Sequence, residues 1–357
     1  MTSKSSEIIR LSDHTAIAGG RRSAAQQSIF RRHDLSEVDL ALFNEVIGTR
    51  AVLSDSMRGI GFRPFRTNVV NALDGLRVAV RRGDIDMLVL EANQQPRDVY
   101  NLVHEIRNGK LGPNPFLVIS IVTWRADKGL IQAFLKAGAD DVVVMPASIS
   151  FASGRVDNLI DNRREFVVTT SYVGPDRRLR SRAMADELGT ILVPNGLRYK
   201  ATGDESAKPN GARLQRINRV VQEHRLRRLT LRLESLTGQL EYAAAEQPDA
   251  PPQSACMSEL SDLISRITSL TKDDGRMTVS ELITSLGAVQ AATEGRQQVH
   301  SDIFALLKVH SQALLAMQRG DKEAADLVVR AVRTAANVVD ERTRQGSGDE
   351  EDVAIRI

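Results

Sequence analysis

A glutamate at the end of a short apolar run is the first residue of this chain that points to chemistry. Residues 85–91 read Ile-Asp-Met-Leu-Val-Leu-Glu, with Gly83 before them and Pro96 after them. A mostly apolar run of this length is typical of a central strand in a parallel sheet. In open parallel sheets, ligands bind beyond the carboxyl ends of the strands. We therefore expect Glu91 to lie at the mouth of a site.

Four other short apolar runs accompany this one, and apolar residues at helical spacing separate them. The runs cover residues 40–43, 66–70, 116–122 and 141–145, and the predicted helices cover about 48–61, 72–82, 96–108, 127–138 and 150–164. Polar residues end two of the runs, because Asn44 and Glu45 follow the first and Thr123 follows the third. Alternating strands and helices predict an α/β fold with a doubly wound, five-stranded parallel sheet.

Residues 39–164 resemble the receiver domain of bacterial two-component response regulators. The marks are the amide and acid at Asn44-Glu45, the carboxylate of Glu91, the hydroxyl of Thr123, the sequence AGADD at 137–141 and Pro146. The resemblance implies a flavodoxin-like fold and a non-enzymatic role in phosphorelay signal transduction. It also implies that the partners are other signalling proteins.

The resemblance assigns a role to each position of the site. In the family, two acidic residues after the first strand hold Mg²⁺, and an Asp ending the third strand accepts the phosphoryl group. A Thr or Ser and a Lys contact that group, and an aromatic residue three positions before the Lys acts as a switch. The matching positions here are Asn44 and Glu45, Glu91, Thr123, Met145 and, for the switch, Val142.

Three of these positions depart from the family pattern in ways that matter chemically. Asn44 offers an oxygen without charge, the extra methylene of Glu91 moves its carboxylate, and Met145 removes the cation that would pair with a phosphate. Phosphoryl transfer depends on close positioning, so we expect no phosphoryl uptake and no catalytic residue. We expect no metal beyond weak Mg²⁺ binding by Glu45 and Glu91, and no other cofactor.

Three interpretations of Glu91 stay open at this stage. In the first, the carboxylate imitates a phosphorylated aspartate and holds the domain in one state. In the second, Glu91 is functionally neutral. In the third, it is simply a surface carboxylate at a strand end. A separate alternative is a regulator that still accepts phosphate, with Asp86 as substitute acceptor. Asp86 begins its strand and so belongs to the wrong end of the sheet.

The charge of the chain is unevenly distributed. Residues 163–232 hold 16 Lys and Arg against 7 Asp and Glu, a local excess of +9. A nucleic-acid-binding regulator is therefore a further alternative, although the segment shows no helix-turn-helix and no aromatic residues spaced for stacking on bases. Arg178 and Arg182 match the RxxxR pattern of cyclic-dinucleotide-binding PilZ domains, a match that we attribute to chance.

The single cysteine, Cys256, excludes an intramolecular disulfide and favours a reducing cytoplasm. No apolar run is long enough to span a bilayer, so we expect no membrane association.

A leucine seam marks the second half of the chain. Leu226, Leu229, Leu233, Leu236 and Leu240 recur at spacings of three and four, as in a coiled coil. Such a seam needs a covering helix, so we expect a homo-oligomer formed through 213–245 and the later helices. The expected organisation is a disordered basic tail (1–35), a receiver-like domain (36–165), an extended basic connector (166–212), a long coiled-coil-like helix (213–245), a Pro-rich linker (246–256), a helical hairpin or bundle (257–342) and an acidic disordered tail (343–357).

Overall fold

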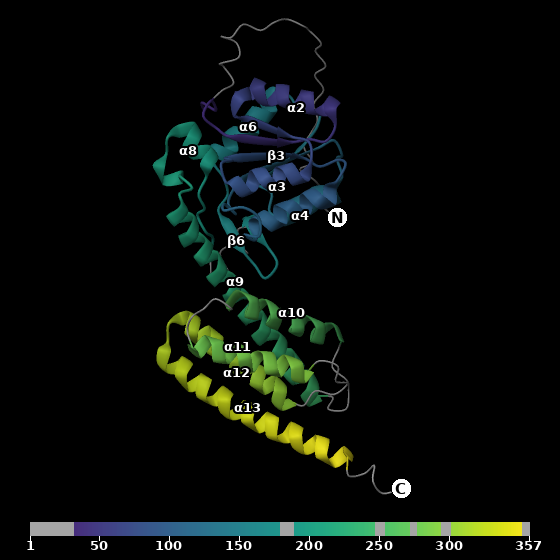
Figure 1. Ribbon diagram of the computed structural model, residues 1–357, viewed down its shortest axis with the longest axis vertical. Helices are drawn as coiled ribbons and strands as arrows, with labels where there is room; N and C mark the ends of the chain where they lie inside the picture. Colours follow the sequence, from purple (N-terminus) through teal and green to yellow (C-terminus); the bar gives the residue numbers. More distant parts are fainter. Residues whose placement is uncertain (1–31, 179–188, 247–253, 272–276, 294–300, 352–357) are drawn as a thin grey trace, which may run out of the picture.

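The computed structural model describes residues 32–178, 189–246, 254–271, 277–293 and 301–351. Figure 1 shows an α/β part and a helical part at opposite ends of the molecule, joined along one long helix. Within the described ranges, no helix is long and apolar enough to cross a membrane.

A five-stranded parallel sheet forms the centre of the α/β part. Its strands are β1 (Leu40–Phe43), β2 (Thr67–Val70), β3 (Met87–Glu91), β4 (Val118–Thr123) and β5 (Asp141–Val144), in the order β2-β1-β3-β4-β5. All neighbouring pairs run parallel. This order is that of flavodoxin-like, doubly wound sheets, so the predicted fold class is confirmed.

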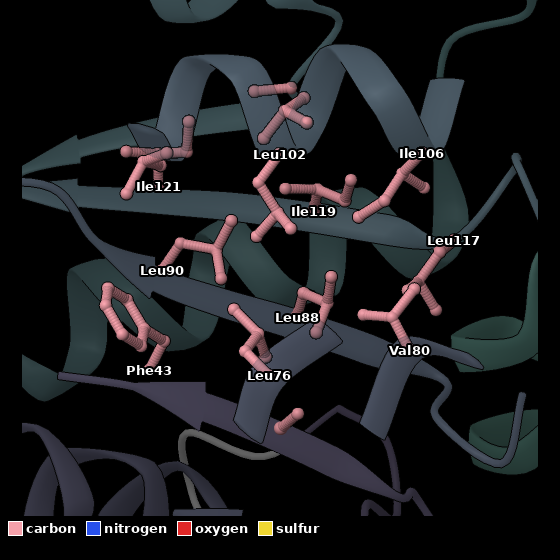
Figure 2. Packing of buried hydrophobic residues seen from close by; sticks show 14 of the residues in the cluster. Phe43, Leu76, Val80, Leu88, Leu90, Leu102, Ile106, Leu117, Ile119 and Ile121 are labelled. Atoms are coloured by element: carbon pink, nitrogen blue, oxygen red, sulfur yellow. The ribbon is translucent and has the colours of Figure 1, made fainter. Parts of the chain in front are cut away.

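Five helices cover the two faces of this sheet. They are α2 (Ile47–Ile60), α3 (Leu73–Arg82), α4 (Pro96–Arg107), α5 (Lys128–Ala137) and α6 (Ile149–Asp161). Residues of α3, α4 and α5 share one buried cluster, and residues of α2 and α6 share another on the opposite face. In Figure 2, Leu76, Val80, Leu102 and Ile106 pack onto Leu88, Leu90, Ile119 and Ile121 of the central strands.

Helix α5 is capped at both ends, within the range 127–138 that the sequence predicts for it. The Asp127 side chain accepts a hydrogen bond from the N–H of Leu130 at 3.0 Å and so caps the first turn. Gly138 ends the helix with a φ of 104°, a left-handed conformation that favours glycine. The caps fix where β5 begins and therefore where its carboxyl end lies.

The segment 166–212 is more structured than the expected extended connector. Strands β6 (Phe166–Val168) and β7 (Val173–Pro175) form an antiparallel hairpin, and α8 (Gly196–Thr202) and the short helix η3 (Glu205–Ala207) follow. Phe166 is buried beside Phe116, and Leu197 joins the cluster under α2 and α6. This segment folds onto the α/β part because its apolar residues are needed to cover that part.

The edges of the expected segments also differ from the structure at several points. Leu35 and Val38 pack with the α2–α6 cluster, so folded structure starts before residue 36. Helix α13 (Lys322–Glu351) runs through much of the segment expected as an acidic tail. The expected tail at 1–31 and most of the Pro-rich linker lie outside the described residues.

Helix α9 (Gly211–Glu246) belongs to both parts of the molecule. Its first half packs with Phe116 and Phe166 through Leu214, Ile217 and Val221. Its second half joins α10 (Ser254–Thr271), α11 (Met277–Thr293), α12 (Ser301–Arg319) and α13 in a helical bundle. The long helix is thus a shared structural element rather than a free spacer.

The leucine seam is covered within one chain. Leu229 and Leu233 are 0% exposed, and Leu236 and Leu240 are also buried, in a cluster with residues of α10, α11 and α12. The expectation that a second copy must cover this seam is wrong, because the later helices fold back onto it. The leucine seam therefore no longer supports the expectation of a homo-oligomer.

Candidate functional site

The sheet brings the ends of four strands to one edge. Glu91 lies opposite Val122 in the register, and Thr123 lies opposite Val144. The backbone N–H of Asn44 donates to Val70 O at 3.0 Å, and that of Met145 donates to Thr123 O at 2.8 Å. Asn44, Glu91, Thr123 and Met145 therefore lie along the carboxyl edge of the sheet, as the sequence predicts.

Glu91 is buried and only half satisfied. Its side chain is 2% exposed, and Oε1 accepts a hydrogen bond from the N–H of Asn93 at 3.0 Å. Oε2 is buried without a hydrogen-bond partner. Burial raises the pKa of Glu91, the charge of Glu45 raises it further, and the Asn93 bond opposes both effects. The interpretation of Glu91 as a surface carboxylate is therefore wrong.

The two residues after β1 are already engaged with their own surroundings. Asn44 is 0% exposed, its Oδ1 accepts from the N–H of Val46 at 2.8 Å, and its Nδ2 donates to Thr49 Oγ1 at 3.1 Å. Glu45 Oε1 accepts from Gln95 Nε2 at 2.7 Å. The side chain of Asn44 thus organises the start of α2 instead of facing a ligand.

This donor set does not fit the Mg²⁺ that the family pattern implies. Mg²⁺ requires several oxygen ligands in near-octahedral geometry. Here one carboxylate, Glu91, has a raised pKa, and the Asn44 oxygen already accepts the Val46 N–H. Among the described residues, no group of three or more His, Cys, Asp or Glu side chains is arranged to hold a metal.

Thr123 points to an amide that the sequence analysis overlooked. Its hydroxyl donates to Asn93 Oδ1 at 3.1 Å, and the same oxygen accepts from the N–H of Trp124 at 2.9 Å. Asn93 therefore ties the end of β4 to the loop after β3, where its own N–H binds Glu91. Asn93 follows Glu91 by two residues in the loop after β3, and this position in the sequence could have indicated that Asn93 belongs to the site.

Met145 and Val142 carry neither charge nor ring. Met145 packs against the α2–α6 cluster, and Val142 packs against the α3–α4–α5 cluster. Met145 provides no cation for Glu91, and neither residue can perform the aromatic movement of the family switch. The site consequently has a buried acid, a hydroxyl and two amides, but no partner for a phosphoryl group's charge.

Asp86 lies at the opposite edge of the sheet. Its Oδ2 accepts from the N–H of Asp39 at 3.0 Å, where β1 begins. Burial raises the pKa of Asp86 to about 6, against the lowering effects of that hydrogen bond and of Lys200. Asp86 therefore lies away from Glu91, at the end of the sheet where its place in the sequence predicts it.

A buried charge network, which the sequence analysis did not predict, also lies at this opposite edge. Asp140 accepts hydrogen bonds from Arg107 at 2.8 Å and from Arg163 at 2.8 Å. Both guanidinium groups lie 5.2 Å from the centre of the Phe166 ring. Although burial opposes it, Arg163 and Arg107 hold the pKa of Asp140 below its usual value. Asp140 belongs to the AGADD sequence, so its spacing was visible but its partners were not.

Many arginines of the basic segment are used within the chain. Arg163 also donates to Pro194 O at 2.8 Å, and Arg177 donates to Ala139 O at 2.9 Å. Arg232 binds Glu259 at 2.7 Å, and Arg225 binds the side chain of Asn108. The surface charge available to nucleic acid is therefore smaller than the sequence count suggests. Arg182, of the RxxxR match, lies outside the described residues.

Comparison with known proteins finds solved structures of response regulators and receiver domains that resemble part of this chain. No protein-family model matches this sequence, and no curated protein matches it. A response regulator from Thermotoga maritima is 22% identical, with 35% of this chain and 99% of that chain covered and a TM-score of 0.29. The receiver domain of a sensor histidine kinase from Pseudomonas aeruginosa is 20% identical, with 34% of this chain and 95% of that chain covered and a TM-score of 0.29. The response regulator DrrB from Thermotoga maritima is 14% identical, with 53% and 88% covered and a TM-score of 0.30. At these identities the likeness concerns the fold alone.

Proposed function

We propose that this chain is a signalling protein whose α/β domain works without taking up a phosphoryl group, and whose output passes through contacts with other proteins. The observation that carries the proposal is the state of Glu91. Its carboxyl group is buried with one oxygen unpartnered, and Met145 stands where a cation would be needed. A transferred phosphoryl group would meet neither a fitting metal site nor a charge-assisted partner.

Glu91 is proposed to be functionally neutral rather than a permanent imitation of phosphate. A phosphorylated aspartate carries close to two negative charges, and its effect depends on them. A single carboxylate carries at most one negative charge, and burial, with a smaller contribution from Glu45, raises the pKa of Glu91. Of the two interpretations left open, this supports the neutral one, in which Glu91 is one member of a hydrogen-bonded group with Asn93 and Thr123.

The helical bundle is the proposed output surface, and α9 is the proposed connection to it. The first half of α9 packs on the α/β part, and the second half is buried in the bundle. Arg225 of α9 binds Asn108 at the end of α4, and Arg266 of α10 donates to Thr170 O in the β6–β7 turn. A partner that binds the α/β part would therefore act directly on elements that support the bundle.

Intact-mass measurement after incubation with acetyl phosphate and Mg²⁺ tests the proposal. We expect no mass increase of one phosphoryl group on the wild-type chain. We also expect none on Glu91→Asp, because Met145 would still leave the phosphoryl charge unpaired. Losses in a group of residues that acts as a unit are not additive, so the triple change Glu91→Asp, Met145→Lys and Asn44→Asp is the variant in which labelling should first be measurable. A phosphoryl adduct on the wild-type chain that disappears in Glu91→Gln would refute the proposal.

A further inference from the structure

A polar pocket lies at the opposite side of the α/β part from Glu91, where α6, α8, η3 and the start of α9 meet. Its volume is about 240 Å³, and its lining includes four arginines, Arg163, Arg164, Arg198 and Arg213, and two aspartates, Asp161 and Asp204. Leu192, Val193 and Ala207 add apolar surface to the same pocket. The pocket lining therefore combines four arginines with an apolar wall, and small-molecule sites have a similar mixture.

Internal ion pairs use only part of this charge. Arg163 binds the buried Asp140 at 2.8 Å, and Arg198 binds Asp204 at 2.8 Å. The carboxylate of Asp161 lies 3.0 Å from His33 and 3.8 Å from Arg32. Both lining aspartates are thus occupied, and so are two of the four lining arginines.

Arg164 and Arg213 have no carboxylate partner among the described residues. Arg164 donates to the backbone oxygen of Asp176 at 2.9 Å, while the carboxylate of Asp176 is bound by Arg178. Arg213 donates to the backbone oxygen of Ser206. A carbonyl oxygen uses one of the five N–H groups of a guanidinium and cancels none of its charge. Two of the four lining arginines therefore form no ion pair among the described residues.

We propose that this pocket binds a small phosphate monoester. Such a group carries close to two negative charges at neutral pH, which matches the two uncompensated arginines. Planar guanidinium groups can each donate two parallel hydrogen bonds to phosphate oxygens. A cavity of about 240 Å³ has room for several water molecules and suits a ligand the size of a sugar phosphate. The apolar wall would contact the part of the ligand without charge.

The position of the pocket gives the ligand a structural consequence. Arg164 follows α6, whereas Arg213 belongs to the first turn of α9. A phosphate held between these arginines links the α/β part to the helix that enters the bundle. Ligand binding would thus stiffen this junction, independently of any chemistry at Glu91.

Calorimetric titration of the full chain with ribose 5-phosphate tests the proposal, with ribose and inorganic sulfate as comparison ligands. We expect saturable binding of one ribose 5-phosphate per chain and no binding of ribose. Arg164→Gln and Arg213→Gln should each weaken binding at least about tenfold, since each removes charged hydrogen bonds. Arg219→Gln, at an exposed position of α9 outside the pocket lining, is the matched control and should bind as the wild type does. Thermal melts monitored by the fluorescence of Trp124 identify any variant that fails to fold, and the other variant then decides.

Several results would overturn the assignment. One such result is the absence of ribose 5-phosphate binding at about 10 mM, since any affinity weaker than that is negligible. Another is that both pocket variants bind ribose 5-phosphate as tightly as the wild type does. Competition by sulfate as strong as that by ribose 5-phosphate would reduce the pocket to an adventitious ion site. A further such result is that a single-stranded oligonucleotide binds more tightly than ribose 5-phosphate, with Arg219→Gln weakening its binding as much as the pocket variants do. That result would assign the arginines to a nucleic-acid-binding surface.

Discussion

Removing the carboxylate of Asp140 should destabilise the α/β part more than any change at the carboxyl edge of the sheet. Asp140 receives hydrogen bonds from Arg107 and Arg163 and also from the N–H of Ile119, at 2.8 Å. Both ends of the Arg107–Asp140 pair are essentially buried, with exposed side-chain fractions of 0% and 1%. Asp140→Asn would leave two buried guanidinium groups without a counter-charge.

The expected magnitude follows from that uncompensated charge. Breaking a buried ion pair by removing one partner costs about 3–5 kcal/mol of unfolding free energy. The matched control is Glu105→Gln, which breaks the part-exposed Arg77–Glu105 pair of the same domain, with exposed fractions of 28% and 32%. Solvent screens such a pair, so its loss should cost about 1 kcal/mol or less.

Urea unfolding monitored by Trp124 fluorescence measures both variants. Trp124 is the single tryptophan of the chain and follows β4, so its signal reports on the α/β part. We expect a lower midpoint for Asp140→Asn with an unchanged slope, because a local change in charge should not alter the surface exposed on unfolding. A loss no larger than that of Glu105→Gln would show that Arg107 and Arg163 find other partners, and would refute the reasoning.

The pH dependence of Asp140 gives the same network a second test. The pKa of Asp140 is depressed in the folded state, so the unfolded chain takes up a proton first as the pH falls. The stability contributed by the carboxylate is therefore present above its unfolded pKa of about 4 and is lost as the pH falls through the folded pKa. Asp140→Asn should remove this part of the acid sensitivity.

Two further predictions concern the helical bundle. Leu233→Ala should destabilise the bundle by about 2–5 kcal/mol in circular dichroism melts, whereas Leu327→Ala, at an exposed position of α13, should have little effect. Light scattering should give the same molar mass for Leu233→Ala as for the wild type. A lower molar mass for the variant would mean that a second copy does cover the seam. His310 is buried with Nδ1 2.7 Å from Leu306 O and Nε2 2.9 Å from Ser285 Oγ, and burial lowers its pKa. Because the folded state disfavours the protonated ring, the bundle should lose stability as the pH falls below the pKa of about 6.5 that histidine has in the unfolded chain. His310→Gln should remove that loss. Equal acid sensitivity of the variant and the wild type would contradict this account.

The local pattern of the sequence determined most of the α/β fold. Short apolar runs such as 85–91 predicted strands, and Asp127 and Gly138 predicted the limits of α5, because periodicity and capping depend on neighbouring residues. The same reasoning placed Glu91 and Thr123 at one edge, since parallel strands leave their carboxyl ends together. The missing cation at Met145 follows instead from the family resemblance, which implies a Lys at that position.

Only the tertiary structure decided which groups meet. The leucine seam at 226–240 required a cover, but its spacing could not distinguish a second chain from α10 and α12 of the same chain. The basic segment 163–232 suggested a nucleic-acid-binding surface, yet Arg163 contacts Asp140 and Phe166 in the interior. Likewise, the orphaned oxygen of Glu91 and the link through Asn93 depend on loop geometry. Burial and pairing arise from residues distant in sequence, so local pattern predicts that a group needs a partner and the folded chain determines which one it finds.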